Sequence, residues 1–383
     1  MVDITKLQRL AILYPKAIGD FYFALPALHT LRRALRDVHI TLVVKQKQAP
    51  LVLPQKGVLA DEVLVLGGDV GCLEVRRQLS LAAVDTVLDL AGNDQSGLLL
   101  TCRGGRRLRP HAADCKGMAA LYSPWAESLP RLIPGQHRVE ELLAFSRVLV
   151  DAPPVYTFAL ALPAQAVEES ERLIAERDLR SGSVIVLNLG ASRDTKRWPA
   201  AHFRILANLL LEAGHRVVFT GAAAFKADGS HDARTIAQFA AEGLIDGESC
   251  IDLVSDNGLS AERHLQRDVH LLRYAQVARV VVGNDTGPMH IAGSVGEDAH
   301  NKTVSLFGPT NWGRYAPYDP SRRFPDQPAG TWNRVLCASV DCRPVGTTEA
   351  CRCYRRGCAD PKCMKMLHPD SVFETIMDIL GGK

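Results

Sequence analysis

The sequence predicts an α/β protein made of two doubly wound domains, each a parallel sheet with helices on both faces. The chain has 383 residues, which is long for a single core and favours two domains. Short β-branched runs alternate with stretches of helical periodicity, a pattern typical of parallel sheets. This alternation stops at Asp151-Ala152-Pro153-Pro154 and then starts again. We therefore expect domains over residues 1–160 and 161–368, facing each other across a ligand-binding cleft.

The expected elements follow that order along the chain. In the first domain, β-branched runs predict strands over residues 10–14, 40–44, 63–66 and 86–90, and apolar periodicity predicts helices over 21–35 and 139–150. In the second, a helix over 164–179 precedes strands over 184–189, 217–220, 280–282 and 303–307. Segments 104–114 and 308–335 are rich in Gly, Pro and Arg and lack periodicity, so we expect loops there. A helical stripe of apolar residues over 369–380 predicts a final helix.

The composition is that of a globular protein and argues against a nucleic-acid ligand. Apolar residues make up 47% and charged residues 23% of the chain, and the formal net charge is only +3. No run approaches the length of about 18 apolar residues that indicates a membrane helix. Residues 1–6 also lack the pattern of a signal peptide. We therefore expect a cytoplasmic protein, and contact with a membrane surface stays open.

The most informative segment follows the predicted strand over 280–282. It reads Gly283-Asn284-Asp285-Thr286-Gly287-Pro288-Met289-His290. A strand that stops here and restarts as a helix leaves backbone N–H groups unpaired, and the positive end of the helix dipole then favours a diphosphate. Thr286 adds a hydroxyl, Gly287 permits close approach of a ligand, and Pro288 suits the first helical turn. The alternative is an ordinary turn in which Asp285 only caps the helix and His290 is a packed residue.

Three further strand ends carry candidate site residues. Asp20 follows the first strand, where it either caps the next helix or acts as a general base. Ser192 and Lys196 follow the strand over 184–189 and supply a hydroxyl and a flexible positive charge, which suit a phosphate; a solvated basic turn is the alternative. Gly221 follows the strand over 217–220, and the small residues there leave room for a base or ribose.

Two clusters of one residue type complete the candidates. Arg103, Arg106 and Arg107 either bind phosphates or carboxylates of an acceptor or form a solvated basic loop. Six cysteines are crowded into one tail segment: Cys337, Cys342, Cys351, Cys353, Cys358 and Cys363. In a reducing compartment such crowding favours a structural metal, iron or zinc, held by four of the six, with reduced thiols or disulfides as alternatives.

Taken together, several of these segments resemble the heptosyltransferase family, glycosyltransferase family nine. The resemblance rests on the order and spacing of Gly19-Asp20, Lys196-Arg197-Trp198-Pro199, residues 283–290 and Phe307-Gly308-Pro309-Thr310-Asn311. The family implies a GT-B fold, in which a first Rossmann-like domain receives the acceptor and a second binds the nucleotide-sugar donor. It also implies that the terminal segment, 369–383, forms a helix that crosses back to the first domain.

The resemblance also implies roles for individual residues. Asp20 matches the base that deprotonates the acceptor hydroxyl, after which transfer inverts the anomeric carbon with no need for a divalent metal. The donor contacts match Ser192, Lys196, Asp285, Thr286, Gly287 and His290. The implied reaction moves heptose from ADP-heptose to a sugar of the lipopolysaccharide inner core, at the inner face of the inner membrane. The tail cysteines resemble those of iron-holding members, with Cys337, Cys342 and Cys363 as the best matches.

One departure from the family pattern keeps alternatives open. Many members carry a glutamate, which holds the donor ribose, shortly after the glycine that matches Gly221. Here Ala222, Ala223 and Ala224 follow, and the first acids are Asp228 and Asp232. Another nucleotide sugar as donor, or a protein as acceptor, therefore stays open. Outside the transferases, a sugar-nucleotide epimerase or a non-catalytic nucleotide-sugar binding protein would use the same scaffold.

Overall fold

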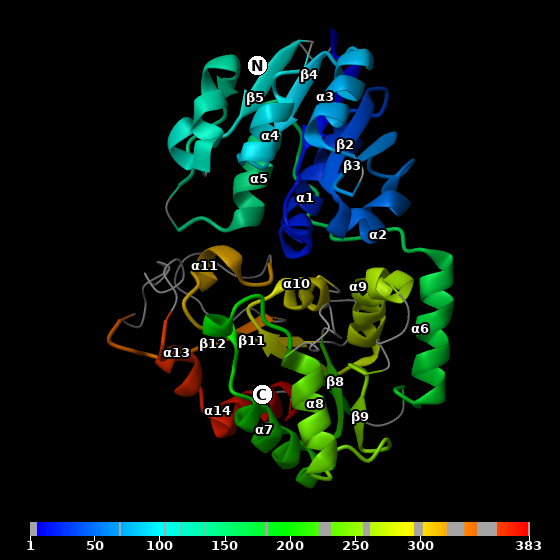
Figure 1. Cartoon of the computed structure of the whole chain (residues 1–383), viewed down its shortest axis with the longest axis vertical. Helices are drawn as coiled ribbons and strands as arrows, with labels where there is room; N and C mark the ends of the chain where they lie inside the picture. The colour runs from blue at the N-terminus through cyan, green and yellow to red at the C-terminus, as the bar shows by residue number, and fades with distance from the viewer. Residues whose placement is uncertain are drawn as a thin grey trace. The chain divides into compact units, whose positions relative to one another are not determined.

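The computed structural model describes residues 6–381 apart from 69, 103–104, 116, 134, 181–182, 222–230, 256–260, 295–301, 320–332 and 343–357. The chain divides into two compact units, Met1–Pro163 and Ala164–Lys383 (Figure 1). Each unit is built on its own parallel sheet with flanking helices, as the sequence predicts, and each sheet has six strands. None of the helices described is long and apolar enough to cross a membrane.

The first unit has a parallel sheet in the order β3-β2-β1-β4-β5-β6. Its strands are β1 (Arg9–Leu13), β2 (His39–Lys45), β3 (Glu62–Leu66), β4 (Thr86–Asp89), β5 (Arg106–Arg109) and β6 (Glu127–Ser128). Its α-helices are α1 (Ile18–Ala34), α2 (Ala49–Val52), α3 (Cys72–Leu81), α4 (Asp94–Leu99) and α5 (Arg138–Ser146). The chain adds β2 and β3 on one side of β1 and then crosses back to place β4 on the other. The loops after β1 and β4 therefore diverge at the carboxyl edge of the sheet.

The second unit repeats this plan in the order β12-β11-β10-β7-β8-β9. Its strands are β7 (Val184–Asn188), β8 (Arg216–Thr220), β9 (Cys250–Asp252), β10 (Val280–Asn284), β11 (Lys302–Phe307) and β12 (Asn333–Cys337). Its helices are α6 (Ala164–Glu176), α7 (Ala200–Glu212), α8 (His231–Ala241), α9 (Ala261–Val277), α10 (Gly287–Gly293), α11 (Trp312–Tyr315), α13 (Lys362–Lys365) and α14 (Pro369–Gly381). Here the strand order reverses between β7 and β10.

The central strand β7 shows why the β-branched runs form buried strands. Ile185 and Leu187 face a core that is shared with α7, α8 and α14, whereas Val184 and Val186 face a second core shared with α6, α9 and α10. Both faces of the strand are therefore covered by helices. This accounts for a continuous apolar run in the sequence, where a strand with one solvated face would alternate apolar and polar residues.

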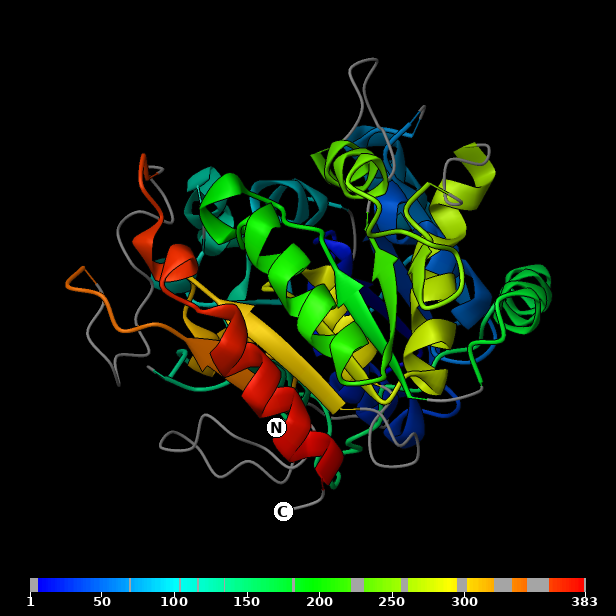
Figure 2. The same cartoon turned by 90° about the horizontal axis from the view of Figure 1, so that it is seen from below.

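The terminal helix α14 packs within the second unit. Val372 and Ile376 lie in the core that also contains Leu206 of α7 and Leu306 of β11. Figure 2 shows α14 beside α7 and β11, and it contacts both of them. The helix is where the sequence predicts it, and its buried apolar side chains cover the sheet of its own unit.

Other differences concern short strands. Residues 104–114 were expected to form a loop, yet β5 lies there, and its Arg106 forms an ion pair with Glu127, at the start of β6. The expected loop over 308–335 contains α11 and the start of β12 among its described residues. Helix α1 begins at Ile18, earlier than the expected start at residue 21, so Gly19 and Asp20 lie inside the helix. The sequence did not predict β5 or α11, because β5 is rich in charged residues and α11 is short, so neither has an apolar run.

Candidate functional site

The site in the second unit lies where β7 and β10 end, at the reversal of the strand order. In open α/β sheets this position forms a crevice that binds ligands. The loop after β7 carries Ser192 and Lys196, and the turn after β10 carries Asp285 and Thr286. The two strands are hydrogen-bonded neighbours, with Gly283 opposite Asn188. The fold therefore brings the predicted donor-binding segments together.

Lys196 and Asp285 form a buried ion pair at this edge. The Lys196 Nζ lies 2.7 Å from Asp285 Oδ2 and donates to the Asp285 carbonyl at 3.3 Å. The two side chains are 9% and 4% exposed. Lys196 is therefore not part of a solvated basic turn, and Asp285 does not cap the helix that follows. The pair holds one ammonium group beside the start of α10.

The start of α10 has the features that the sequence predicts. Pro288 lies in the first turn, and Thr286 is the N-cap residue, although its hydroxyl donates to the Asn284 carbonyl at 3.2 Å and makes no cap. Within the described part of the chain, the N–H groups of Thr286 and Gly287 have no hydrogen-bond acceptor. These donors lie next to Lys196, so the turn is suited to an anion.

The remaining candidates of the second unit have different surroundings. The Met289 side chain packs into the core, and a Cβ added at Gly283 would come within 2.7 Å of its sulfur. His290 is buried on α10. We expected the space beside Gly221 to be open. The carboxylate of Asp232 fills it, so closely that a Cβ atom added to Gly221 would lie 3.0 Å from Asp232 Oδ2.

In the first unit, Asp20 lies at the corresponding reversal between β1 and β4. Helix α1 begins at Ile18 with Ala17 as its N-cap residue, and there is no side-chain cap, so Asp20 does not cap the helix. Its backbone carbonyl accepts from the Tyr14 hydroxyl at 3.0 Å. Among the residues that the structure describes, no hydrogen bond or ion pair engages its half-buried carboxylate. A carboxylate of this kind is available to accept a proton.

In the same unit, a buried ion pair joins the carboxyl ends of β4 and β5. Asp89 accepts from the N–H groups of Ala91 and Gly92 and from the Ser96 hydroxyl, and Arg109 lies 3.5 Å away. Burial raises the pKa of Asp89, and the nearby Arg109 opposes that rise. Both side chains are fully buried. The pair is therefore a rigid support for the edge and is out of reach of a substrate.

Comparison with known proteins identifies the family. The model of glycosyltransferase family 9 (heptosyltransferase) matches residues 72–324. The chain belongs to this family. A search of curated proteins finds no match.

Solved structures share the fold of this family 9 glycosyltransferase. The glycosyl transferase family 9 protein of Veillonella parvula DSM 2008 is 19% identical, with a TM-score of 0.75 over 100% of this chain and 99% of that chain. E. coli ADP-heptose lps heptosyltransferase II is 16% identical, with a TM-score of 0.67 over 98% and 99%. E. coli heptosyltransferase WaaC, solved with ADP, is 18% identical, with a TM-score of 0.64 over 97% and 100%. The two sheets with their flanking helices thus form a GT-B fold.

The arginines expected to bind the acceptor are not brought to the Asp20 edge of this glycosyltransferase. Arg106 and Arg107 pair with Thr86 and Val87 at the amino end of β4, whereas Asp20 follows the carboxyl end of β1. Arg106 is held by Glu127, and Arg107 donates to the Cys102 carbonyl at 2.8 Å. Arg103 lies outside the described residues. Both arginines therefore have partners within the first unit, at the end of the sheet opposite to Asp20.

The tail cysteines are only partly brought together. Cys337 lies opposite Phe307 in the β11/β12 register, and the Cys363 sulfur would lie 3.4 Å from a Cβ at Gly308. Cys342 is exposed and Cys358 is half-buried, while Cys351 and Cys353 lie outside the described residues. Within the described ranges, no group of three metal-ligating side chains is assembled. The described thiols alone therefore do not form the four-ligand site that a structural metal takes.

Sequence reasoning missed three residues that organise the family 9 site. Asn284 accepts from the Trp198 N–H at 2.8 Å and donates to the carbonyls of Leu189 and Gly190. Arg197 forms an ion pair with Asp232 at 2.7 Å. Asn284 and Arg197 stand within the motifs that carry the resemblance, but nothing in those motifs shows which groups their side chains reach.

Proposed function

We propose that this family 9 glycosyltransferase transfers heptose from ADP-heptose to a sugar hydroxyl of the lipopolysaccharide inner core. One observation carries the proposal: the Lys196 ammonium lies beside N–H groups of the turn after β10, at the point where the strand order reverses. A nucleoside diphosphate carries the negative charge that such donors bind. The E. coli heptosyltransferase WaaC, which shares this fold, was solved with ADP.

The donor diphosphate occupies the β7/β10 edge in this proposal. Lys196 supplies a positive charge, and Ser192, Thr286 and Gly287 supply hydroxyl or N–H donors. These groups are already fixed by the sheet, so they need little reorganisation when charge develops on the leaving diphosphate. The same donors that bind the nucleotide therefore also stabilise the transition state.

Asp20 is the base of the proposed reaction. The acceptor hydroxyl oxygen attacks the anomeric carbon, the bond from that carbon to the diphosphate oxygen breaks, and the hydroxyl proton passes to the Asp20 carboxylate. Attack opposite the leaving group inverts the anomeric centre. A positioned general base contributes about 10²- to 10⁴-fold to such a step. The buried Asp89 cannot replace Asp20, because it is enclosed and paired with Arg109.

Transfer with the purified protein tests this proposal. ADP-heptose and a heptose-free lipopolysaccharide core are supplied together, and ADP release is followed with the anomeric configuration of the product by NMR. We expect ADP release only when both substrates are present, with inversion, and a rate about 10²- to 10⁴-fold lower for Asp20→Asn at unchanged ADP affinity.

Three outcomes contradict parts of this account. Wild-type turnover by Asp20→Asn removes the base assignment. Turnover with another nucleotide sugar, together with no turnover with ADP-heptose, shows that the donor is not ADP-heptose. An isomerised sugar nucleotide formed without any acceptor indicates an epimerase.

The cysteine-rich tail enters the proposal only as a structural element. Cys337 and Cys363 border the end of β11, and a metal that also recruits cysteines outside the described residues would tie the tail to this strand. No step of the proposed transfer passes through it.

A further inference from the structure

The loop after β7 is fixed by an unusual set of contacts to its carbonyl groups. Arg197 Nη1 donates to the Leu189 carbonyl and Nη2 to the Ala191 carbonyl, both at 3.3 Å. Asn284 Nδ2 donates to the Gly190 carbonyl at 3.0 Å and to that of Leu189 at 3.2 Å. Three consecutive carbonyls are thus turned toward the two side chains.

This arrangement determines where the N–H groups of the loop point. In a trans peptide the N–H points opposite to the carbonyl of the same plane. The N–H groups of Ala191 and Ser192 therefore point away from Arg197 and Asn284. Within the described part of the chain neither has an acceptor, whereas the Gly190 N–H is bonded to Asn188 Oδ1 at 3.2 Å. Consecutive N–H groups turned to one side form a typical anion-binding concavity.

Asp232, on the first turn of α8, holds Arg197 in the geometry that this requires. Its Oδ1 lies 2.7 Å from Arg197 Nη1, and the two side chains are only 4% and 15% exposed. Its Oδ2 faces the carboxyl ends of β7 and β8, close to Gly190 and Gly221. A side chain at Gly221 would crowd the carboxylate, since an added Cβ would lie 3.0 Å from Oδ2 and 3.1 Å from the Asp232 Cβ. Gly221 therefore leaves room for the ion pair.

We propose that the Asp232–Arg197 pair is a clamp that aims the Ala191 and Ser192 N–H groups at the donor diphosphate. The inference rests on the proposed function and adds two positioning residues to it. Neither residue needs to touch the nucleotide. Arg197 acts through the loop, and Asp232 acts through Arg197. Loss of the clamp should therefore weaken binding of the phosphates and leave binding of the nucleoside unchanged.

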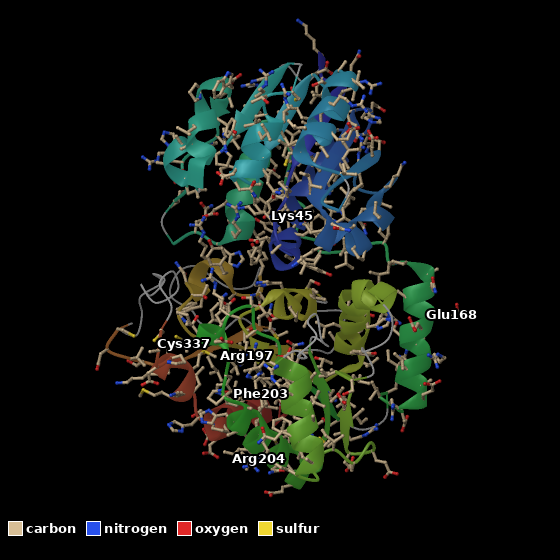
Figure 3. All side chains as sticks on the ribbon, viewed as in Figure 1. Lys45, Glu168, Arg197, Phe203, Arg204 and Cys337 are labelled. Carbon is tan, nitrogen blue, oxygen red and sulfur yellow. The ribbon has the colours of Figure 1, made fainter. Side chains whose placement is uncertain are left out.

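Arg197→Lys is the main test, because lysine keeps the charge next to Asp232 but lacks the planar fork that reaches two carbonyls. Arg204→Lys is the matched control. Arg204, on α7, pairs with Glu242 just after α8 at 3.0 Å, and among the described residues no hydrogen bond joins it to the loop after β7. Figure 3 shows it on the far side of Phe203 from Arg197. ADP binding is measured by calorimetry, adenosine binding by ligand-detected NMR, and folding by thermal melting.

We expect Arg197→Lys to bind ADP at least about 10-fold more weakly, the cost of one or two N–H donors to a charged group. Adenosine affinity should stay at the wild-type value, and Arg204→Lys should match the wild type for both ligands. Asp232→Asn should show the same selective loss of ADP binding. If the melting temperature of Arg197→Lys is too low for titration, Asp232→Asn serves as the main test.

Other outcomes separate the clamp from the proposed function. Equal weakening of ADP and adenosine, or wild-type ADP affinity in a folded Arg197→Lys or Asp232→Asn protein, overturns the clamp alone. Failure of the wild-type protein itself to bind ADP overturns the proposed donor and the clamp with it.

Discussion

Lys196 keeps a charge in a buried position, and stability alone does not explain it. Moving a charged group out of water into the protein costs several kcal/mol for each of the two ions. The attraction between them offsets this desolvation cost only when their geometry is good. The 2.7 Å contact to Asp285 provides that geometry, at exposed fractions of 9% and 4%. An apolar pair of similar volume would be about as stable. We attribute the retained charge to the diphosphate that we propose for this site.

Substituting Lys196 should separate these two contributions. Lys196→Met should weaken ADP binding by about 10- to 100-fold, because a charged hydrogen bond contributes about 1.5–3 kcal/mol. It should also destabilise the protein by about 3–5 kcal/mol, since Asp285 is left as an uncompensated buried charge. The double variant Lys196→Met/Asp285→Asn should recover most of this stability in urea unfolding without recovering ADP affinity. Unchanged calorimetric affinity in the single variant would exclude Lys196 from the donor site.

The pairing of these residues also shows a limit of sequence reasoning. The motifs around Lys196 and Asp285 identify both as candidates, because each follows a buried strand. Their contact spans 89 positions of the chain, and it depends on β7 and β10 becoming neighbours only after the strand order reverses. Arg197 and Asp232 were not recognised as partners either, because their contact spans 35 positions and depends on the ends of β7 and β8 lying side by side.

The turn before β9 shows how one side chain can set the start of a strand. Asp246 Oδ1 accepts from the N–H groups of Glu248, Ser249 and Cys250, each at 2.8 Å. Burial by itself raises the pKa of Asp246, but these backbone donors outweigh it, and the net pKa lies below the ordinary value. The ionised carboxylate is therefore stabilised in the folded state.

This shift predicts a pH-dependent contribution to stability. Because the folded-state pKa is depressed, the contribution is present above the unfolded-state pKa of about 3.9 and is lost as the pH falls through the folded-state value. Asp246→Ala should lower the melting temperature at pH 7 by about 2–4 °C, for a loss of about 1 kcal/mol. The difference from wild type should shrink below pH ~4. Asp37→Ala, which removes an exposed aspartate, should show neither effect, and a deficit for Asp246→Ala that persists at low pH would contradict the assignment.

Among the elements, the long strands could be predicted and the short ones could not. Strands β1, β2, β4, β7, β8, β10 and β11 carry apolar runs that are buried on both faces, and the sequence predicts each of them to within a few residues. β9 has three residues, and β5 consists largely of arginine, so neither has an apolar signal. The arginines of β5 are accommodated by Asp89 and Glu127, partners from other strands.

At the scale of the whole molecule, one topology occurs twice, and each copy places candidate residues where its strand order reverses. Asp20 follows β1 in the first unit, and Lys196 and Asp285 follow β7 and β10 in the second. The family and its GT-B fold were predictable, because the motifs at these edges keep their order along the chain. The apolar stripe over 369–380 likewise predicted α14, whose Val372 and Ile376 lie in the core of the second unit.

A crystal structure of the protein with ADP is the most direct test of the central claim. We predict that the diphosphate lies at the β7/β10 edge, with its oxygens within hydrogen-bonding distance of Lys196 Nζ and of the N–H groups of Ser192 and Thr286. ADP bound at any other edge of either sheet, or a diphosphate out of reach of Lys196, would contradict the account.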